Sequence, residues 1–167
     1  KMEPRSFWTG ILKSMKINVI NRSKVNTTIP KKGKLIMIAN HPFGIIDGII
    51  MCSLASKIRS DFKILTHETL GFAPELNKYI LPIDFKENSK KTVKNNIETS
   101  KNAKKHLLND GLLIIFPSGS VSVAKNLKSA AEDDEWKQFT AKIIKQTKAD
   151  VLPVYFDGKN GLLYHLF

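Results

Sequence analysis

Short, mostly apolar segments recur along the chain and alternate with segments in which apolar residues follow helical spacing. The apolar segments span residues 35–39, 62–66, 79–83, 112–116 and 151–156. Strands that are apolar on both faces are typical of a parallel sheet, which helices cover on each side. The alternation therefore predicts an α/β domain with a largely parallel central sheet flanked by helices.

Helical periodicity marks the segments between these strands. It is clear over residues 45–58 and 136–147, and in the second of these it places Trp136, Phe139, Ile143 and Ile144 on one side. The lysine-rich segment 89–108 also predicts a helix. Its few apolar positions are compatible with one buried face: Val93, Ile97, Ala103, Leu107 and Leu108. Residues 124–135 are expected to form the most mobile loop.

The first part of the chain predicts an amphipathic helix. Pro4 suits a first helical turn, and apolar residues recur at helical spacing from Phe7 to Val19. Basic residues flank this stripe: Lys13, Lys16, Arg22 and Lys24. Two interpretations remain open, because such a helix can lie in a membrane interface or pack on its own domain.

These patterns divide the chain into two parts. Residues 1–30 are expected to form the N-terminal amphipathic helix and a linker, and residues 31–167 the α/β core. The chain stops directly after the apolar stretch 162–166. We therefore expect the core to be truncated at its C-terminus.

The charge of the chain favours anionic partners. Lys and Arg number 27 against 15 Asp and Glu, which gives a formal net charge of +12. Nucleic acid, an anionic bilayer surface and acidic proteins all suit this charge. The sequence shows no nucleic-acid-binding module and no interleaved aromatic and basic surface, so nucleic acid is not an expected partner.

Two further features narrow the class of protein. No apolar run reaches the roughly 18 residues that cross a bilayer, and no secretory signal opens the chain. We expect a peripheral protein on the cytoplasmic face of the membrane. Cys52 lies in an apolar stretch and is expected to be a core residue, and no histidine has a second ligand at the spacing of a zinc site. No metal is expected.

The segment Ala39 to Gly48 carries the first candidate site. His41 follows the predicted strand 35–39 directly, Gly44 permits a sharp turn, and Asp47 falls in the first turn of the next helix. Such a turn can bring Asp47 back to His41. A carboxylate that holds an imidazole in one tautomer leaves the other nitrogen free to remove a proton from a hydroxyl. An isolated pair of this kind is more often structural.

The segment Ile114 to Ser122 carries the second candidate site. A predicted buried strand breaks after Phe116 into a loop of small residues that is rich in hydroxyls and in backbone N–H groups. Such a loop can hold an anionic head group or an oxyanion. A plain turn after a strand is the alternative.

Taken together, these segments resemble the lysophospholipid acyltransferase superfamily, typified by 1-acylglycerol-3-phosphate acyltransferases. The chain is most similar to the branch of hemolysin-like and ornithine-lipid or glycine-lipid O-acyltransferases. The landmarks that carry the resemblance occur in order over most of the chain: Asn40 to Gly48, Ile80 to Asp84, Phe116 to Ser122 and Val151 to Asn160.

The resemblance implies an acyl transfer without a covalent enzyme intermediate. It assigns His41 as the general base for an acceptor hydroxyl and Asp47 as the residue that orients it. The acceptor would be a lysolipid. The donor would be an acyl thioester of coenzyme A or of acyl carrier protein, and no cofactor would be bound. Substrate-binding residues are expected in both loops: Asn40, Phe43, Gly44, Pro117, Ser118, Gly119, Ser120 and Ser122.

The chain departs from the family pattern at two points. Five residues separate His41 from Asp47 where the superfamily usually has four, a longer form that the hemolysin-like branch shares. Ser118 and Ser120 stand where the family carries a glutamate. No arginine lies near residues 80–85 to bind a phosphate. An amino-acid lipid is therefore a better expected acceptor than a glycerol phosphate, and a non-catalytic lipid-binding protein on the same fold is the alternative.

Overall fold

The computed structural model describes residues 4–22, 30–67, 76–84, 89–124 and 129–161. A five-stranded sheet forms its centre, with the strand order β3-β2-β4-β1-β7, and each pair of neighbouring strands is parallel. The strands are β1 (Leu35–Ala39), β2 (Phe62–His67), β3 (Ile80–Ile83), β4 (Leu112–Ile115) and β7 (Asp150–Val154). The predicted α/β fold with a parallel sheet is confirmed.

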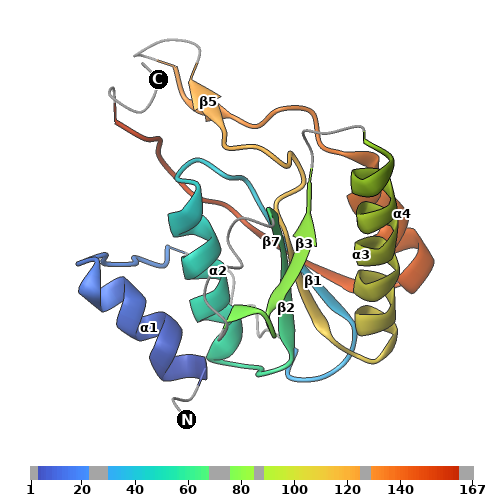
Figure 1. Cartoon of the computed structure of the whole chain (residues 1–167). Helices are drawn as coiled ribbons and strands as arrows, with labels where there is room; N and C mark the ends of the chain where they lie inside the picture. The colour runs from blue at the N-terminus through green and yellow to red at the C-terminus, as the bar shows by residue number, and fades with distance from the viewer. Residues whose placement is uncertain (1–3, 23–29, 68–75, 85–88, 125–128, 162–167) are drawn as a thin grey trace.

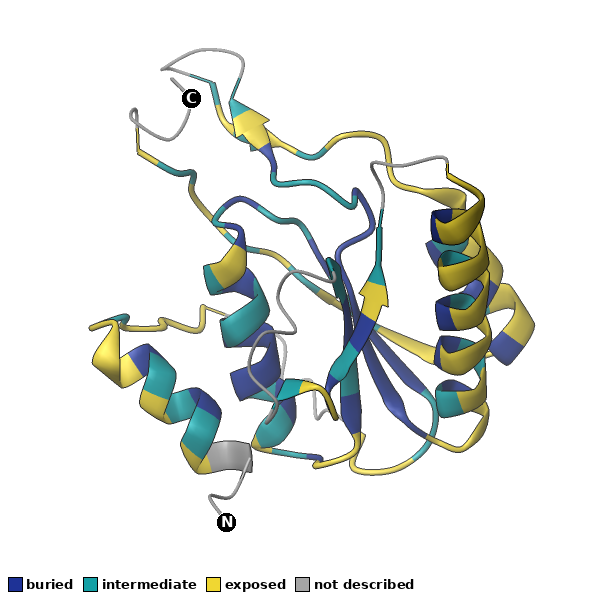
Figure 2. Cartoon of the chain, in the orientation of Figure 1, coloured by how far each residue is buried: buried dark blue, intermediate teal, exposed yellow. Residues whose placement is uncertain are grey.

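Helices cover both faces of the sheet (Figure 1). The helices α1 (Pro4–Ser14) and α2 (Ile45–Ser56) lie on one face, and α3 (Lys90–Leu108) and α4 (Gln138–Thr147) lie on the other. Successive strand residues point to opposite faces. Met37 and Ile114 therefore join the core under α2, whereas Ile36 and Leu113 join the core under α3 and α4. Figure 2 shows these strands as the most deeply buried part of the molecule.

The register of the central strands determines where the site can form. Ile38 of β1 pairs with Ile115 of β4, so the two strands end at the same level. The loops that follow them, 40–44 and 116–122, are distant in sequence but leave the sheet side by side. This edge, beyond the carboxyl ends of the strands, is where open parallel sheets bind their ligands.

Helix α1 packs on its own domain. Trp8 and Leu12 are buried, and the Trp8 ring contacts the rings of Phe62 and Tyr79 at centroid distances of 6.2 and 5.7 Å. The helix ends before Val19. Lys16 adopts a left-handed conformation with φ 55°, and the N–H of Ile17 donates to the carbonyl of Leu12, which together stop the helix.

Helix α3 is rotated relative to the predicted buried face, which is confirmed only at Ala103 and Leu107. Val93, Ile97 and Leu108 are about half exposed, whereas the buried residues are Thr92, Thr99, Ala103 and Leu107. Hydrogen bonds to the end of β3 account for this rotation. Thr99 donates to the carbonyl of Pro82 at 2.6 Å, and the Asn96 side chain bonds both backbone groups of Asp84.

The segment before α4 also differs from expectation. Helix α4 begins at Gln138, so Trp136 lies outside it and is half exposed. Two short antiparallel strands, β5 (Val123–Ala124) and β6 (Ala131–Glu132), lie where a mobile loop was expected. Residues 125–128 of that expected loop fall outside the described part of the chain.

Two simpler expectations can be compared with the structure. Cys52 is buried in the core as predicted, and this burial raises the pKa of its thiol. Within the described residues, no helix is both long enough and apolar enough to cross a membrane.

Candidate active site

His41 and Asp47 lie in contact. The Nδ1 atom of His41 is 3.1 Å from Oδ2 of Asp47, whose side chain is completely buried. The N–H of Phe43 donates to the same oxygen at 2.8 Å. An ionised carboxylate can only accept, so this contact favours the tautomer with the proton on Nδ1, which leaves a lone pair on Nε2.

Gly44 makes this contact possible. It precedes α2 with φ 66° and ψ −124°, a conformation that residues with a side chain rarely adopt. The turn at Gly44 directs Asp47, in the first turn of α2, back towards His41. The longer spacing between the two residues is thus accommodated within the turn.

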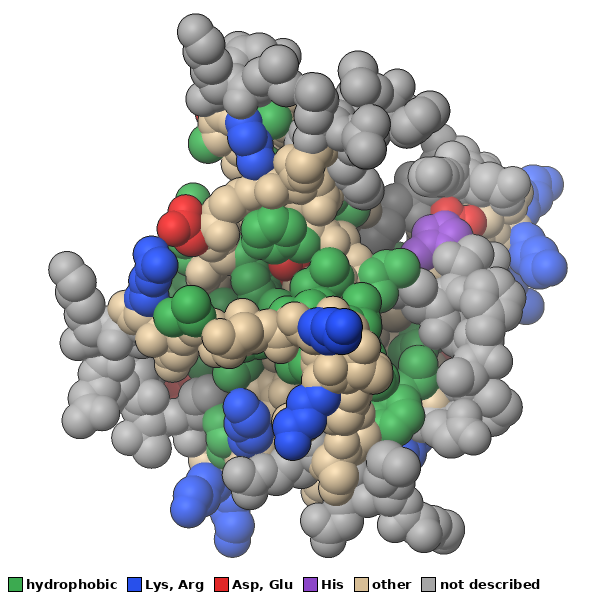
Figure 3. All heavy atoms as spheres, turned by 90° about the vertical axis from the view of Figure 1, so that its left-hand side faces the viewer, with side chains coloured by type: hydrophobic (Ala, Val, Ile, Leu, Met, Phe, Trp, Pro, Cys, Tyr) green, Lys and Arg blue, Asp and Glu red, His purple; other side chains and the backbone are tan. Residues whose placement is uncertain are grey.

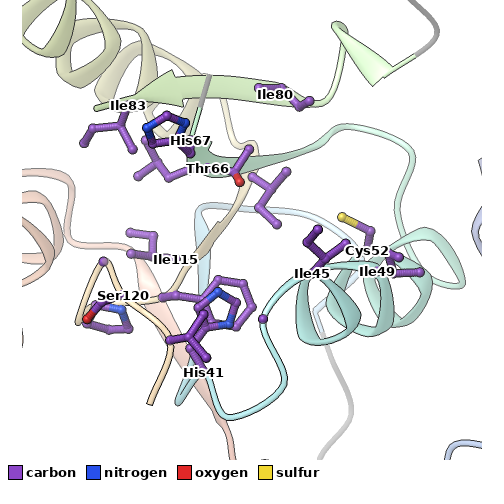
Figure 4. Close-up of a pocket in the computed structure, with 18 of the residues that line it drawn as sticks. His41, Ile45, Ile49, Cys52, Thr66, His67, Ile80, Ile83, Ile115 and Ser120 are labelled. Carbon is purple, nitrogen blue, oxygen red and sulfur yellow. The ribbon is translucent and has the colours of Figure 1, made fainter. Parts of the chain in front are cut away.

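The imidazole is held between the protein and a cavity. It stacks on the ring of Phe116, with centroids 4.0 Å apart and planes at 26°, and 18% of the His41 side chain is exposed. It lines a cavity of about 370 Å³. Figure 4 shows His41 and Ser120 on the side of this cavity opposite Ile80.

The cavity is mainly apolar. Its walls come from α1, α2, β2, β3 and the loop after β4, and they include Trp8, Ile11, Ile45, Ile49, Cys52, Ile64, Leu76, Ile80 and Ile83. Sequence patterns assigned most of these residues to predicted strands and helices and predicted none of them to line the site. Trp8 and Ile11 show that the N-terminal helix forms part of the site wall.

Several predicted substrate-binding residues line this cavity: Gly44, Pro117, Gly119 and Ser120. Gly119 has φ 73°, which turns the loop sharply after Phe116. The hydroxyl of Ser120 donates to Oδ2 of Asp134 at 2.7 Å. A hydroxyl and the turn of the loop therefore lie beside His41 in otherwise apolar surroundings.

The other predicted substrate-binding residues surround His41 without lining the cavity. The Asn40 amide donates to the carbonyl of Phe156 at 2.9 Å and accepts from its N–H at 2.7 Å. Ser118 is buried and donates to the carbonyl of Ser120. The N–H of Phe43 is held by Asp47. These residues organise the two loops.

The landmark after β7 supports the turn at residues 40–44. Asn160 donates to the carbonyl of Pro42 at 2.8 Å. Gly158 lies against the ring of Phe43, because a Cβ atom there would come within 2.9 Å of Phe43 Cζ. The final strand and its extension thus brace the segment that carries His41.

Asp133 and Asp134 are site residues that sequence reasoning missed. Asp133 accepts hydrogen bonds from the N–H of His41, from the Ser122 hydroxyl and from the Trp136 indole. The two carboxylates beside the loop 117–122 therefore come from a separate segment and not from the loop itself. The acidic run Glu132 to Glu135, unusual in so basic a chain, was the available signal.

A second histidine also borders the cavity. His67 is the last residue of β2 and lies 3.8 Å from a carboxylate oxygen of Asp84. Its side chain is 37% exposed, twice as much as that of His41. This residue offers an internal comparison for His41 because both line one cavity and both face an aspartate.

Comparison with known proteins gives consistent matches. The protein family described as Acyltransferase matches residues 16–157. A lyso-glycine lipid O-acyltransferase of Bacteroides thetaiotaomicron is 31% identical over 139 residues, which are 82% of this chain and 48% of that protein. One of Phocaeicola vulgatus is 27% identical over 139 residues, 82% of this chain and 47% of that protein.

The matches have a defined extent. The chain spans about half the length of the curated relatives it matches. The family match, in contrast, includes β1, the turn with His41 and Asp47, the loop after β4 and the whole of β7. On the match over residues 16–157, the chain belongs to the acyltransferase family.

Proposed function

We propose that the protein transfers a fatty acyl group from a thioester to the hydroxyl of a lysolipid. The observation that carries this proposal is the His41–Asp47 pair, in which Asp47 binds Nδ1 of an imidazole that lines an apolar cavity. A base in such a place can meet a hydroxyl that belongs to an apolar molecule. Family membership and the named relatives support the same reaction.

The chemistry requires one base and no covalent enzyme intermediate. Nε2 of His41 takes the proton of the acceptor hydroxyl as its oxygen attacks the thioester carbonyl. The C–S bond then breaks, and the leaving thiolate receives that proton from His41. Asp47 stabilises the imidazolium formed between these steps, because its buried carboxylate lies 3.1 Å from Nδ1.

The cavity suits the acyl chain of a substrate. Its walls are isoleucine, leucine, tryptophan and cysteine side chains, from which an alkyl chain displaces water favourably. Polar residues such as Ser120 line the cavity together with His41, so they can bind the polar head group of the same substrate. We infer that the acceptor is an amino-acid lipid, in keeping with the lyso-glycine lipid named for both relatives.

We also propose that the protein acts at the cytoplasmic face of an anionic membrane. Hydrophobic side chains gather in the middle of the face formed by α1 and α2, with Lys and Arg side chains around them (Figure 3). Met15, Val19 and Ile20 are exposed after α1. Positive charge would also favour an acidic acyl carrier protein or the phosphates of coenzyme A as donor.

Thioester consumption by the purified full-length protein tests the proposal. Acyl-coenzyme A and acyl carrier protein thioesters are offered with lyso-glycine lipid and with lysophospholipids. His41→Ala should lower the rate by ~10²–10⁴-fold, the usual contribution of a general base. His67→Ala is the matched control, since His67 lines the same cavity, and it should retain most of the activity.

The outcomes distinguish an acyltransferase from a non-catalytic lipid-binding protein on the same fold. Turnover by the wild type that is lost in His41→Ala supports the acyltransferase. Lipid binding by a folded wild type that consumes no thioester with any acceptor would instead identify a non-catalytic lipid-binding protein. Equal losses in His41→Ala and His67→Ala would refute the assignment of His41 as the base.

A further inference from the structure

Both polar groups of the His41 main chain form hydrogen bonds with Ser122 or Asp133. The N–H of His41 points at Oγ of Ser122 at 3.2 Å and at Oδ1 of Asp133 at 3.1 Å. The N–H of Ser122 donates in return to the carbonyl of His41 at 2.9 Å. Both backbone groups of the candidate base are therefore occupied by contacts from later parts of the chain.

The carboxylate of Asp133 is itself fully engaged. Oδ1 accepts from the Ser122 hydroxyl as well as from His41, and Oδ2 accepts from the indole N–H of Trp136 at 2.9 Å. The N–H of Lys137 donates to the carbonyl of Pro117 at 2.9 Å and fastens this segment to the loop after β4. Three donors converge on one acceptor-only group, so the group is fixed in place.

Asp133 differs in this respect from its acidic neighbours. Glu132, Asp134 and Glu135 are exposed, whereas Asp133 is half-buried between β6 and the loop 117–122. A solvated acidic cluster would leave all four carboxylates in water. The contact with His41 therefore belongs to Asp133 alone and is not a general property of the acidic run.

The contact matters because the imidazole must satisfy two geometric demands at once. It has to keep Nδ1 on Asp47 and present Nε2 to the cavity, and its direction follows from the position of the His41 backbone. Displacements of the order of 1 Å at a reacting group can cost about 10²-fold in rate.

We propose that Asp133 is a positioning residue for the acyl transfer, holding the His41 backbone so that the imidazole stays aligned with Asp47 and with the cavity. The proposal rests on the proposed function for its kinetic consequence. Its structural consequence, the orientation of the His41 ring, does not depend on which acceptor the enzyme uses.

The kinetic test compares Asp133→Ala with Glu135→Ala in the full-length protein. Both variants remove one carboxylate from the same acidic run, but only Asp133 contacts His41. Asp133→Ala should lower kcat about 10- to 100-fold, with KM for the lysolipid within about threefold of wild type. Glu135→Ala should leave both values unchanged.

A conservative variant guards against misfolding of Asp133→Ala. Asp133→Asn keeps one oxygen for the His41 N–H and the Ser122 hydroxyl, so it should retain more activity than the alanine variant. A loss of kcat in Asp133→Ala that is no larger than its loss of folded protein, or a loss in Asp133→Asn as large as that in Asp133→Ala, would overturn the proposal.

The second test needs no turnover. In protein labelled with ¹⁵N-histidine, the proton on Nδ1 of His41 should give an exchange-protected NMR signal, because it is bonded to a buried carboxylate. This signal should persist in Glu135→Ala and broaden or vanish in Asp133→Ala. An unchanged signal refutes the positioning role. A changed signal in a protein without acyl transfer would uphold that role while refuting the proposed function.

Discussion

Asp47 combines complete burial with hydrogen-bond partners on one of its two oxygens only. Oδ2 accepts from Phe43 N–H and lies on His41 Nδ1, whereas Oδ1 has no hydrogen-bond partner among the described residues. A buried carboxylate is costly unless it is paired. The pairing with His41 and the hydrogen bond from Phe43 therefore offset the cost of burying Asp47.

Asp47→Asn is the sharpest test of that pairing. The variant keeps the size of the side chain, but its amide can donate to Nδ1 and so favour the tautomer that places the proton on Nε2. In that tautomer His41 cannot accept a proton from the acceptor hydroxyl. We expect kcat for acyl transfer to fall by ~10²–10⁴-fold, with folding retained.

The control for this variant is Asp84→Asn, which alters the aspartate that faces His67 in the same cavity region. It should change kcat little. The kcat of each variant is measured, and circular dichroism checks that each variant is folded. If Asp47→Asn turned over as fast as wild type, His41 would not act through the Asp47-bound tautomer.

Asp133 shows that the type of a side chain does not by itself reveal which residues contact His41. Three hydroxyl-bearing serines in the loop 117–122 drew attention because of the chemistry they can perform. Two of them, Ser118 and Ser122, are buried at 1% exposure and bind other parts of the protein. The residue that contacts the His41 backbone lies 92 positions further along the chain, in no recognisable motif.

The turn between α3 and β4 shows how an element end can make stability depend on pH. His106 lies in the last turn of α3, and its Nε2 bonds the carbonyl of Leu112 at 3.0 Å. The ring packs on Gly111, where a Cβ atom would lie 2.4 Å from it. Burial lowers the pKa of His106, although the bond to Leu112 and the charge of Asp61 oppose this shift.

This lowered pKa predicts an acid-sensitive fold. Above the ordinary histidine pKa of about 6.5, His106 is neutral in both states and contributes no pH dependence. As the pH falls below that value, the unfolded chain takes up a proton that folded His106 resists, so stability decreases until the folded-state pKa is passed. His106→Gln keeps a donor for Leu112 and should flatten this dependence.

Thermal unfolding at pH 7.5 and pH 5.5 measures the effect. The drop in Tm between the two conditions should be smaller in His106→Gln than in wild type. His67→Gln is the control, because His67 lies at the other end of the sheet, at the carboxyl end of β2. An identical drop in all three proteins would contradict the prediction.

The proposed contact with a membrane depends on the net charge of the chain and on its exposed apolar side chains. The net charge of +12 acts over a Debye length of about 8 Å at physiological salt, so it attracts an anionic surface only at close range. Apolar contact must add to it. Ile20 is 68% exposed in the segment that follows α1.

Binding to vesicles that contain phosphatidylglycerol should therefore depend on both the positive charge and the exposed apolar side chains. Ile20→Asp removes an apolar side chain and adds a negative charge, and we expect it to weaken vesicle binding by about tenfold or more. Val93→Asp is the matched control. Val93 is 48% exposed on α3, across the sheet from α1, and its substitution makes the same change of charge.

Co-sedimentation with vesicles at low and high salt provides the measurement. Wild-type binding should fall as salt rises, and Ile20→Asp should bind less than Val93→Asp at each salt concentration. Equal weakening by the two variants would mean that charge alone governs binding. The face with α1 and α2 would then not be the one that contacts lipid.

Local patterns were enough to predict the strands, the parallel sheet and the meeting of His41 with Asp47. Strand and helix formation depends on apolar periodicity within a few residues, and a histidine and an aspartate joined by one glycine turn have few other arrangements. The region of the site follows as well, because parallel strands place their following loops at one edge of the sheet.

The remaining features arise from contacts between segments far apart in the chain. Hydrogen bonds to the end of β3 turn α3 so that Val93 and Ile97 face outward, against their apolar character. Trp136 fits the helical spacing of α4 but lies outside the helix, where its indole N–H donates to Asp133. Trp8 joins the cavity wall because α1 packs on α2. Apolar periodicity cannot predict these contacts, because each of them depends on a partner residue that comes close only in the folded protein.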